Sequence, residues 1–395
     1  MDIVIIANFC RDFSETDNGR FMYLCKEWSK EHKVEIITSD FSHGMKRHKD
    51  ALVHNWPFKI TFLREPGYPT NVCLKRFYSH LIWGINVSKY LKKRAKPDVI
   101  YCAMPSLTAA AKASIYCKRQ EVKFIIDIQD LWPEAFKMVL DIPFVKDIIF
   151  KPFDILANVS YKNADEIVAV SNTYVERAMQ VNSKSLIPHP VFLGTNLKVF
   201  DAYALENKPK TRVDGEIWIA YCGTLGASYD ITCVIDALSI IRKENKYNNV
   251  KFLIMGDGPR KSEFEAYAKS KKVDAVFTGR LPYPEMCGRL VACDIAVNPI
   301  THGAAQSIIN KHGDYAASGL PVVNTQECLE YRDLVESYHM GFNCKNNDAY
   351  DLAEKIRLLI DTPELRAELG KNARKCAEEK FDRKNSYQEI IGLLV

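Results

Sequence analysis

Short runs of apolar residues alternate with longer amphipathic stretches along most of the chain. The runs are continuous rather than alternating, which is typical of parallel strands that helices bury on both faces of a sheet. They form two sets with a proline-bearing, polar segment between them. The first set is Ile3–Ile6, Val34–Thr38, Val99–Cys102, Phe124–Ile128 and Glu166–Val170, and the second is Trp218–Tyr221, Lys251–Ile254, Ala275–Phe277, Ile295–Val297 and Val322–Asn324. The pattern predicts an α/β protein with two doubly wound units.

The segment between the two sets, residues 187–215, predicts a hinge. It holds the sequence IPHP at 187–190 and the polar run ENKPKTRVDG at 206–215, and proline followed by a charged stretch is typical of a linker. A chain of 395 residues is also too long for one ordinary core. We therefore expect one domain over residues 1–190 and a second over residues 191–380.

Composition adds little that is unusual. The chain is 47% hydrophobic and 26% charged, which is ordinary for a globular protein. Its 12 cysteines include no C-x-x-C pair, so a zinc ribbon or a thioredoxin-like site has no support, and reduced thiols in a cytoplasmic protein are expected. The start, MDIVIIANFC, is interpreted as a buried strand rather than a signal peptide, and no apolar run approaches the length of about 18 residues of a membrane span.

Charge is distributed unevenly. Residues 1–190 carry a net charge of +6 and the remainder −1, and residues 51–100 hold nine basic against two acidic side chains. A solvated face is the usual meaning of such a run, but it also suits an anionic phospholipid surface or a phosphorylated acceptor. We expect peripheral docking on the inner face of the plasma membrane, and no nucleic-acid partner. The residues expected to take part are Lys75, Arg76, Lys89, Lys92, Lys93, Arg94 and Lys96, interleaved with Tyr78, Trp83 and Tyr90.

Two glycine-bearing turns follow strands of the second set, YCGTLGASYD at 221–230 and MGDGPRKSEF at 255–264. Glycine lets the backbone approach a phosphate, and a helix N-terminus attracts negative charge, so Gly223 and Gly226 are donor-binding candidates. A turn that needs glycine for structural reasons alone is the alternative. Lys261 stands where a dinucleotide-binding fingerprint has its third glycine, and no G-x-x-x-x-G-K-[ST] loop occurs. NAD-binding and P-loop proteins are therefore disfavoured.

A third feature is the segment THGAAQSIINKHGDYAASGLPVV at 301–323. Ser307 is predicted to cap a helix whose first turns carry Lys311 and Asp314. Backbone amides and the lysine would meet a diphosphate, and the carboxylate would accept hydrogen bonds from paired ribose hydroxyls. A surface helix that merely carries charges is the alternative interpretation.

Taken together, these segments resemble glycosyltransferase family 4, whose members have the GT-B architecture of two facing Rossmann-like domains with an interdomain cleft. The resemblance spans nearly the whole chain, and the motifs match in order and spacing. They are DNGRF (17–21), DIQDLWPE (127–134), ADEIVAVS (164–171), YCGTLG (221–226), MGDGP (255–259), FTGRLP (277–282) and NKHGDYAASGLPVV (310–323).

The resemblance implies a retaining transfer of a hexose-type sugar from a nucleotide diphosphate donor, with UDP as the expected nucleotide. It implies no metal or other cofactor, a donor held by the C-terminal domain and an acceptor held mainly by the N-terminal one. The D-L-W-P signature resembles bacterial members that assemble surface polysaccharides such as O-antigen or capsule, so a glycan or lipid-linked acceptor is expected. Residues 381–395 would form a helix that crosses back to the first domain.

The resemblance also implies roles for residues that bind the donor. Asp314 matches the second acid of the E-x7-E motif, expected at the ribose, and Gln306 stands in place of the first acid. Gly19 matches a loop glycine that faces the donor phosphate. Arg280 and Lys311 lie in segments that face the nucleotide, and we expect them to neutralise the diphosphate because the YCGTLG turn lacks the usual basic residues.

The catalytic candidates follow from the same comparison. Many members of the family carry a histidine near the DIQDLWPE segment, whereas this chain has Gln129 and Asp130 there. Trp132 and Pro133 have packing as an equal alternative to a role in the site. No D-x-D at a strand end and no cluster with ligand spacing indicates a metal site.

Two other functions remain open. A sugar-nucleotide epimerase of the same architecture would bind the same donor and would need in-line acid and base carboxylates. A non-catalytic sugar- or nucleotide-binding protein would bind the donor without consuming it.

Overall fold

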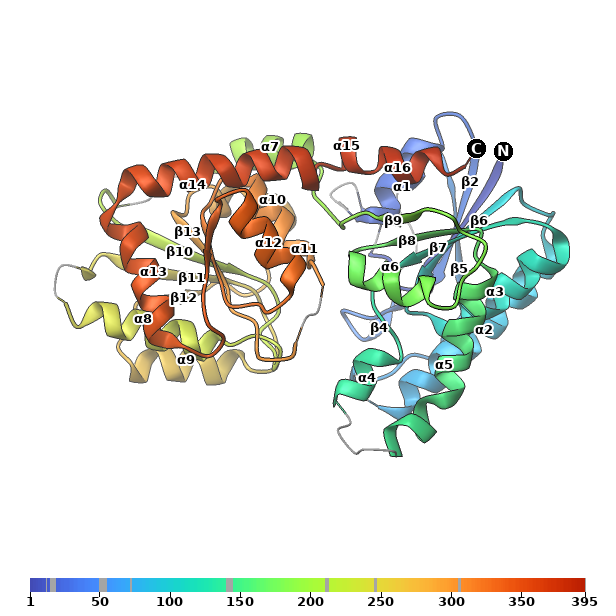
Figure 1. Ribbon diagram of the computed structural model, residues 1–395, viewed down its shortest axis with the longest axis horizontal. Helices are drawn as coiled ribbons and strands as arrows, with labels where there is room; N and C mark the ends of the chain where they lie inside the picture. Colours follow the sequence, from blue (N-terminus) through green and yellow to red (C-terminus); the bar gives the residue numbers. More distant parts are fainter. Residues whose placement is uncertain are drawn as a thin grey trace. The chain divides into compact units, whose positions relative to one another are not determined.

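The computed structural model describes residues 1–11, 13–14, 19–49, 55–71, 73–139, 145–209, 213–244, 247–304 and 307–394. The chain divides into two compact units. The first unit is Met1–Val191 with Tyr387–Val395, and the second unit is Phe192–Ser386. Each unit is a parallel sheet with helices packed against it, as Figure 1 shows for each separately.

The first unit contains a parallel seven-stranded sheet in the order β5-β2-β1-β6-β7-β8-β9. The five strands that the sequence predicts here are present, and β5 and β9 are additional. The strands are β1 (Asp2–Ile6), β2 (Lys33–Ser39), β5 (Lys59–Leu63), β6 (Val99–Met104), β7 (Lys123–Ile128), β8 (Glu166–Ala169) and β9 (Pro188–Pro190), and a small antiparallel pair is β3 (Phe41–Ser42) with β4 (Arg47–His48).

The IPHP sequence, expected to mark a hinge, is therefore mostly an edge strand. In β9, Pro188 is the register partner of Ile167 and Pro190 that of Ala169. An edge strand needs to donate hydrogen bonds to one neighbour only, which is why proline is tolerated there. The prolines that suggested a linker instead end the sheet.

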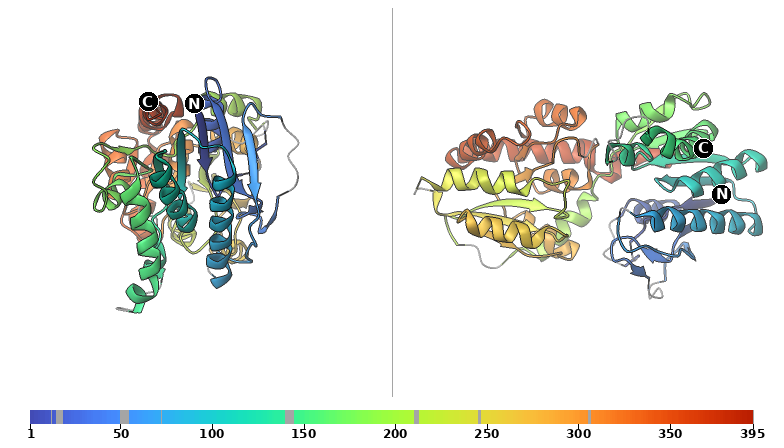
Figure 2. Two further views of the ribbon diagram at one scale, coloured as in Figure 1. Left: turned by 90° about the vertical axis from the view of Figure 1, so that its right-hand side faces the viewer. Right: turned by 90° about the horizontal axis from the view of Figure 1, so that it is seen from below.

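Helices cover both faces of this sheet. α1 and α16 contribute to the core that contains Ile3 and Ile5 of β1. α2, α3 and α5 pack successively against one another, as the views in Figure 2 also show. The helices of the first unit are α1 (Arg20–Trp28), α2 (Leu74–Lys93), α3 (Leu107–Gln120), α4 (Glu134–Val139), α5 (Val145–Asn163), α6 (Asn172–Met179) and α16 (Gln388–Gly392).

The second unit contains a parallel six-stranded sheet in the order β12-β11-β10-β13-β14-β15. All five strands predicted for this half are present, and β15 is additional. The strands are β10 (Ile217–Cys222), β11 (Val250–Met255), β12 (Ala275–Phe277), β13 (Ile295–Asn298), β14 (Val322–Asn324) and β15 (Gly341–Asn343).

Successive residues of β10 point to opposite faces of this sheet and join two cores. Ile219 and Tyr221 pack with α8, α9 and α13 on one face. Ala220 and Cys222 pack with α7, α10, α11, α12 and α14 on the other. The helices of the second unit are α7 (Leu197–Glu206), α8 (Ile231–Arg242), α9 (Lys261–Ser270), α10 (Tyr283–Leu290), α11 (Asn310–Ala317), α12 (Leu329–Ser337), α13 (Ala349–Asp361), α14 (Pro363–Cys376) and α15 (Arg383–Ser386), with a π-helical turn at Ala377–Phe381.

Two expectations about connections differ from the structure. The polar stretch 206–215 lies between α7 and β10, inside the second unit, rather than between units. The single helix expected over residues 381–395 is two short helices. Arg383 of α15 donates to the carbonyls of Leu193 and Gly194, which ties α15 to the second unit, whereas α16 packs with α1 in the first.

The strand order fixes where a ligand can bind. In the second sheet the chain leaves β10 towards β11 on one side and later places β13 on the other, and β1 has the same relation to β2 and β6. Crevices open at the carboxyl ends of the strands where the order reverses in this way. A ligand is therefore expected at the carboxyl ends of β10 and β13, or at those of β1 and its neighbours.

Two further observations concern environment. All 12 cysteines are free thiols, and most are buried. Among the described residues, no helix combines the length and the apolar character that crossing a bilayer requires.

Candidate functional site

The two glycine turns of the second unit pack directly on each other. The N–H of Gly223 donates to the backbone carbonyl of Met255 at 3.0 Å. The N–H of Leu225 donates to the backbone carbonyl of Asp257 at 2.9 Å. A Cβ on Gly256 would lie 1.8 Å from the carbonyl oxygen of Gly223, and Gly223 itself has φ +144°. Glycine is therefore required at both positions by the close packing and the backbone conformation of the turns.

Lys311 reaches this turn from α11. Its side chain is 8% exposed, and its Nζ lies 4.2 Å from the ring centroid of Tyr221 and 4.0 Å from that of Tyr229. A Cβ on Gly223 would meet this Nζ at 3.2 Å. Burial lowers the pKa of Lys311 to about 7, and its Nζ has no hydrogen-bond partner among the described residues. A buried amine that packs against two aromatic faces is suited to binding an anion.

The start of α11 differs from the prediction. Ser307 does not cap the helix, because α11 begins at Asn310 with Ile309 at the N-cap position. The N–H of Ile309 instead donates to Nδ1 of His312 at 3.3 Å. The carbonyl of Ser307 accepts from Nε2 of Gln326 at 2.8 Å, so this residue is held through its backbone.

A buried amide network supports α11 from the sheet. Asn298 at the end of β13 places its Nδ2 within 3.1 Å of His312 Nε2 and 2.8 Å of Asn324 Oδ1. Asn324, at the end of β14, donates in turn to Asn343 of β15 at 2.8 Å. His312 also stacks on Tyr331, with ring centroids 3.5 Å apart. These contacts hold the helix that carries Lys311 against three strand ends.

Asp314 lies one turn after Lys311 and faces other partners. Its Oδ1 accepts hydrogen bonds from Oγ1 of Thr195 at 2.8 Å and from the hydroxyl of Tyr283 at 2.9 Å. No contact joins Asp314 to Lys311 among the interactions of the described residues. The carboxylate is fixed in position, as a residue that orients a ribose would need to be.

The other donor candidates are less enclosed. Gly226 is half-buried in the turn after β10. Arg280 is exposed and follows Gly279, which has φ +74°, at the end of edge strand β12, two strands from β10. The structure therefore does not bring Arg280 into contact with Lys311. Gln306 lies outside the described residues.

Gly19 introduces α1 at the carboxyl edge of the first sheet. It is the N-cap residue in an extended conformation, and its carbonyl accepts the N–H of Tyr23 at 3.0 Å. The next residue, Arg20, forms a buried bidentate pair with Asp127 of β7, with Nε–Oδ2 at 2.9 Å and Nη2–Oδ1 at 3.0 Å. This pair fixes the start of α1 over the end of β7.

The two catalytic candidates are held by neighbouring side chains. Gln129 Nε2 donates to Oδ2 of Asp127 at 3.1 Å, and Asp130 Oδ2 accepts from Nε1 of Trp132 at 3.0 Å. Burial raises the pKa of Asp130, although the bond from Trp132 opposes the shift. Trp132 is buried and its ring stacks on that of His80, with ring centroids 5.3 Å apart.

Sequence reasoning missed several residues of these sites. Arg20 lies within the DNGRF motif and Asp127 within the DIQDLWPE motif. A basic residue in one motif and an acidic residue in the other were the available signal that the two side chains pair. Tyr221 and Tyr229 flank the YCGTLG turn, but only the fold shows that both rings contact Lys311. Thr195 and Tyr283 have no local signal.

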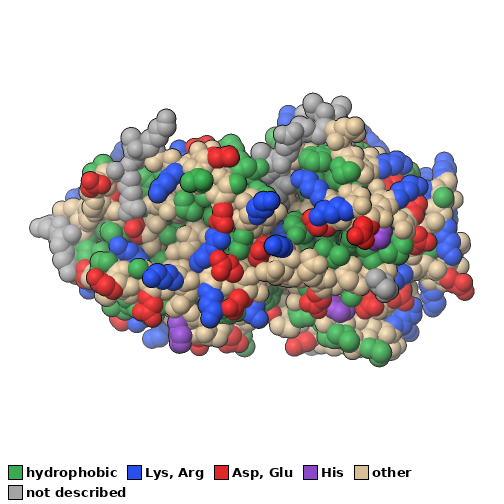
Figure 3. Space-filling model, turned by 90° about the horizontal axis from the view of Figure 1, so that it is seen from above, with side chains coloured by type: hydrophobic (Ala, Val, Ile, Leu, Met, Phe, Trp, Pro, Cys, Tyr) green, Lys and Arg blue, Asp and Glu red, His purple; other side chains and the backbone are tan. Residues whose placement is uncertain are grey.

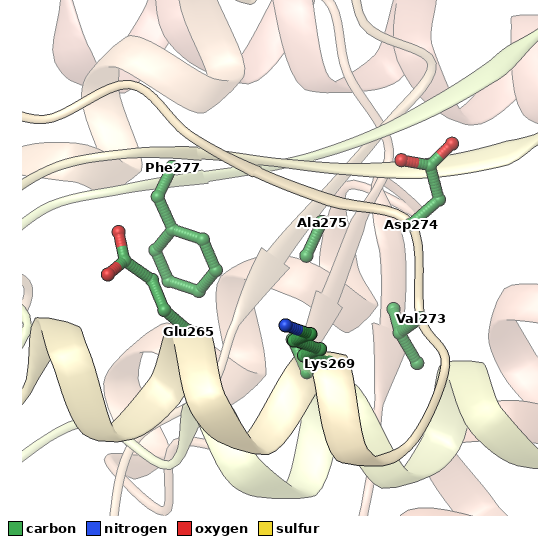
Figure 4. A pocket seen from close by; sticks show the side chains of 7 residues that line it. Glu265, Lys269, Val273, Asp274, Ala275 and Phe277 are labelled. Carbon is green, nitrogen blue, oxygen red and sulfur yellow. The ribbon is translucent and has the colours of Figure 1, made fainter.

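A pocket of about 380 Å³ lies elsewhere in the second unit, between α9 and edge strand β12. Figure 4 shows Lys269 of α9 beside Glu265, with Asp274 and Phe277 on the facing segment. It includes none of the residues discussed above and lies away from the strand order reversal, so we do not assign the donor to it. Within the described part of the chain, no group of three or more His, Cys, Asp and Glu side chains could hold a metal ion.

Comparison with known proteins relates the second unit to a family of transferases. Residues 204–376 match the family model described as "Glycosyl transferases group 1". The match covers somewhat less than half of the chain and includes the whole second sheet, both glycine turns and α11. Gly223, Gly226, Arg280, Lys311 and Asp314 all lie within the matched residues.

Two curated relatives carry related names. The uncharacterized glycosyltransferase MJ1069 of Methanocaldococcus jannaschii is 21% identical over 99% of this chain and 94% of its own length. The probable glycosyltransferase WbjE of Pseudomonas aeruginosa is 22% identical over 59% of each chain. With the domain match, these names support an enzyme of the transferase class.

Solved structures share the fold over the whole chain. HepE of Anabaena, in complex with UDP, is 15% identical with a TM-score of 0.71, covering 100% of this chain and 99% of that one. WaaG, a glycosyltransferase involved in lipopolysaccharide biosynthesis, is 14% identical with a TM-score of 0.67 and the same coverage. At such identity the likeness concerns the fold alone, and that fold is GT-B, with two Rossmann-like domains.

Proposed function

We propose that the chain is a retaining glycosyltransferase that moves a hexose-type sugar from a UDP-sugar to a glycan or lipid-linked acceptor. One observation carries this proposal. Lys311, a buried amine whose Nζ has no hydrogen-bond partner within the described part of the chain, lies against the glycine turn where the strand order of the second sheet reverses. The glycosyltransferase domain match and the UDP bound to HepE support a nucleotide diphosphate as that partner.

The donor would lie along the carboxyl edge of the second sheet. Lys311 and the amides of Thr224 and Gly226 would meet the diphosphate, with Gly223 permitting its close approach to the turn. Asp314 would accept hydrogen bonds from the ribose hydroxyls. Arg280 would approach the phosphates only if the ligand extends towards β12. Ser307 would contribute its backbone, and Gln306 and Gly19 remain donor candidates from the family resemblance.

The reaction would break the bond between the anomeric carbon and the diphosphate oxygen. An acceptor hydroxyl would attack that carbon on the face that the diphosphate leaves, so the configuration would be retained. The hydroxyl proton would pass to the departing phosphate. Asp130 and Gln129 would orient the acceptor, and the fixed positive charge at the diphosphate would supply the largest stabilisation, since one such donor is typically worth about 3–4 kcal/mol.

The acceptor and the setting follow from the resemblance to polysaccharide-assembly enzymes. WaaG is named for lipopolysaccharide biosynthesis, which supports a role in bacterial surface-polysaccharide assembly such as O-antigen or capsule. We propose that the enzyme works on the cytoplasmic side of the membrane, uses no metal and has no nucleic-acid partner.

Membrane docking remains a proposal, but the structure changes the residues that would carry it. Trp83 is fully buried, Arg76 is buried, and Arg94 pairs with Glu35 and Asp2, so these three cannot face lipid. The exposed basic residues are Lys75, Lys89, Lys92, Lys93 and Lys96, and exposed apolar side chains on α2 are Leu74, Tyr78 and Leu81. On the face in Figure 3, Lys and Arg side chains gather along the right-hand edge of the first unit.

Cosedimentation with vesicles that contain an anionic phospholipid tests this docking. The full chain should bind at low salt and dissociate at high salt, because each basic residue near the surface contributes about 1 kcal/mol. The double variant Lys92→Glu, Lys93→Glu should weaken binding, while Lys269→Glu in the second unit should not. Binding that is absent at low salt or unchanged in the double variant would leave a solvated face.

A panel of nucleotide sugars tests the enzymatic proposal. A ligand at 100 times its dissociation constant adds about 2.7 kcal/mol to the free energy of unfolding. One UDP-sugar should raise the unfolding temperature, and it should raise that of Lys311→Met less. No shift with any nucleotide sugar would contradict the donor assignment.

A further inference from the structure

A second cluster of cationic and aromatic side chains lies at the carboxyl edge of the first sheet. Its members come from four segments that follow parallel strands, and the ends of parallel strands meet at one edge. We call it the Arg76 cluster. Its members are Phe9 after β1, His43 and Lys46 after β2, Tyr68, Arg76 and His80 after β5, and Asp130 and Trp132 after β7.

Arg76, in the first turn of α2, is buried without a carboxylate partner. Its Cζ lies 4.4 Å from the ring centroid of Trp132 and 5.6 Å from that of Tyr68. Nη1 donates to the carbonyl of Asn71 at 2.7 Å, while Nε is buried and has no hydrogen-bond partner among the residues that the structure describes. No ion pair joins Arg76 to any acidic residue of the described chain. Burying a cation without an anion costs several kcal/mol, which an anionic ligand would offset.

Lys46 and His43 extend the cluster towards solvent. Lys46 Nζ bonds Oδ1 of Asn71 at 2.5 Å and lies 3.4 Å from Nδ1 of His43. His43 Nδ1 is 2.6 Å from the hydroxyl of Tyr68. Burial, with the charges of Lys46 and Arg76, lowers the pKa of His43 to about 4. The ammonium of Lys46 and the guanidinium of Arg76 are thus close enough to repel each other. Neither forms an ion pair with an acidic residue of the described chain.

His80 lies one helical turn after Arg76. Both of its ring nitrogens are buried and find no hydrogen-bond partner in the described part of the chain, and its ring stacks on Trp132. Burial, followed by the charge of Arg76, lowers its pKa to about 3. Unsatisfied buried nitrogens are costly in a packed core, so their concentration beside a guanidinium without an ion pair among the described residues favours a ligand-binding role over packing alone.

We propose that the Arg76 cluster binds a phosphoryl group of the acceptor. This inference rests on the proposed function, and it narrows the acceptor to a phosphorylated one, either a sugar phosphate or a lipid-linked diphosphate. Each unit then has one anion site at the carboxyl edge of its sheet, with Lys311 for the donor and Arg76 for the acceptor. Asp130, whose charge acts on Arg76, belongs to the same cluster and would face the acceptor group next to the phosphate.

Titration of the full chain with inorganic pyrophosphate separates the two sites. Two equivalents should bind. Lys311→Met should abolish one of them, and Lys46→Gln should weaken the other at least fivefold. Lys118→Gln, which changes an exposed lysine of α3, is the matched control and should stay within twofold of the wild type. Lys46 is partly exposed, so Lys46→Gln should fold. Arg76→Gln is also titrated, provided that its unfolding temperature matches that of the wild type.

The outcomes distinguish this inference from the proposed function. One equivalent that is lost only in Lys311→Met would overturn the Arg76 cluster and leave the donor site intact. One equivalent that is weakened only in Lys46→Gln would overturn the donor site at Lys311 and leave the Arg76 cluster intact. Equal weakening in Lys46→Gln and Lys118→Gln would show general charge attraction and also overturn the cluster. Farnesyl diphosphate and glucose 1-phosphate, used as competitors, then show whether the acceptor phosphate comes from a lipid or from a free sugar.

Discussion

Donor binding should depend on pH through Lys311. The amine is enclosed by Tyr221 and Tyr229 and lies near the neutral thiol of Cys222, and no acidic group among the described residues contacts it. Burial lowers its pKa from 10.5 to about 7, a shift that corresponds to about 5 kcal/mol of unfavourable charging at 1.36 kcal/mol per pKa unit. A diphosphate beside the amine would stabilise the charged form and raise its pKa, so binding would take up a proton.

The expected magnitude follows from the protonated fraction of the free protein. With a pKa of about 7, Lys311 is roughly nine-tenths protonated at pH 6 and one-tenth protonated at pH 8. The dissociation constant of a UDP-sugar should therefore rise about tenfold between these pH values, or about 1.4 kcal/mol. A UDP-sugar is the right probe because its diphosphate is esterified at both ends, whereas UDP itself has a phosphate ionisation near pH 6.

Lys311→Met provides the matched comparison by calorimetry. Its dissociation constant should be high and nearly independent of pH between 6 and 8. The free variant should be more stable than the wild type at pH 7, because it no longer buries an amine that prefers to be charged in the unfolded chain. For the same reason the free energy of unfolding of the wild type should rise from pH 7 to 10 relative to the variant, since over this range the unfolded chain binds more protons. A wild-type pH slope that persists in Lys311→Met would refute the reasoning.

Four further outcomes are expected. Asp314→Ala should raise the donor dissociation constant at least tenfold, about 1.4 kcal/mol, whereas Tyr283→Phe, which removes one bond to the same carboxylate, should have a smaller effect in the same titration. Arg280→Gln should weaken binding of UDP more than binding of uridine if the ligand reaches β12, and equal losses would exclude a phosphate contact. Arg20→Leu should lower the free energy of unfolding by about 3–5 kcal/mol in urea because it leaves Asp127 buried and unpaired, and a smaller loss would show that the pair is replaceable. Turnover should persist in EDTA, and a complete loss restored by Mg²⁺ or Mn²⁺ would contradict metal-independent transfer.

The sequence predicted the sheets well because buried parallel strands leave a local signal. All ten predicted strands are present, and the strands that were missed lie at or near sheet edges, where apolar runs are short or contain proline, as in β9. Most of the IPHP sequence forms strand β9 and not a linker, but the boundary between the two units follows it directly, at Val191 and Phe192, inside the predicted segment 187–215. The helix cap at Ser307 was wrong, because His312 bonds the backbone of Ile309 from inside the helix, and this arrangement has no simple sequence pattern.

The candidate sites were predictable only in part. Motifs identified Lys311 and Asp314 but placed them in one group, whereas the helix turns them towards different partners. The basic run at 75–96 predicts a surface that faces an anionic membrane. The structure instead buries Arg76 and pairs Arg94 with Asp2 and Glu35. Whether a basic residue faces solvent, an acid or an aromatic ring depends on contacts far away in the sequence, which a linear pattern does not contain.

The most direct test of the account is to follow a UDP-sugar that stabilises the protein during incubation with and without a panel of phosphorylated and unphosphorylated glycosyl acceptors. Product masses and anomeric proton couplings would be measured. The account predicts UDP release that depends on an acceptor, with the sugar transferred and its anomeric configuration retained. A donor that is bound but never consumed, or one that is converted to an epimer without any acceptor, would contradict it.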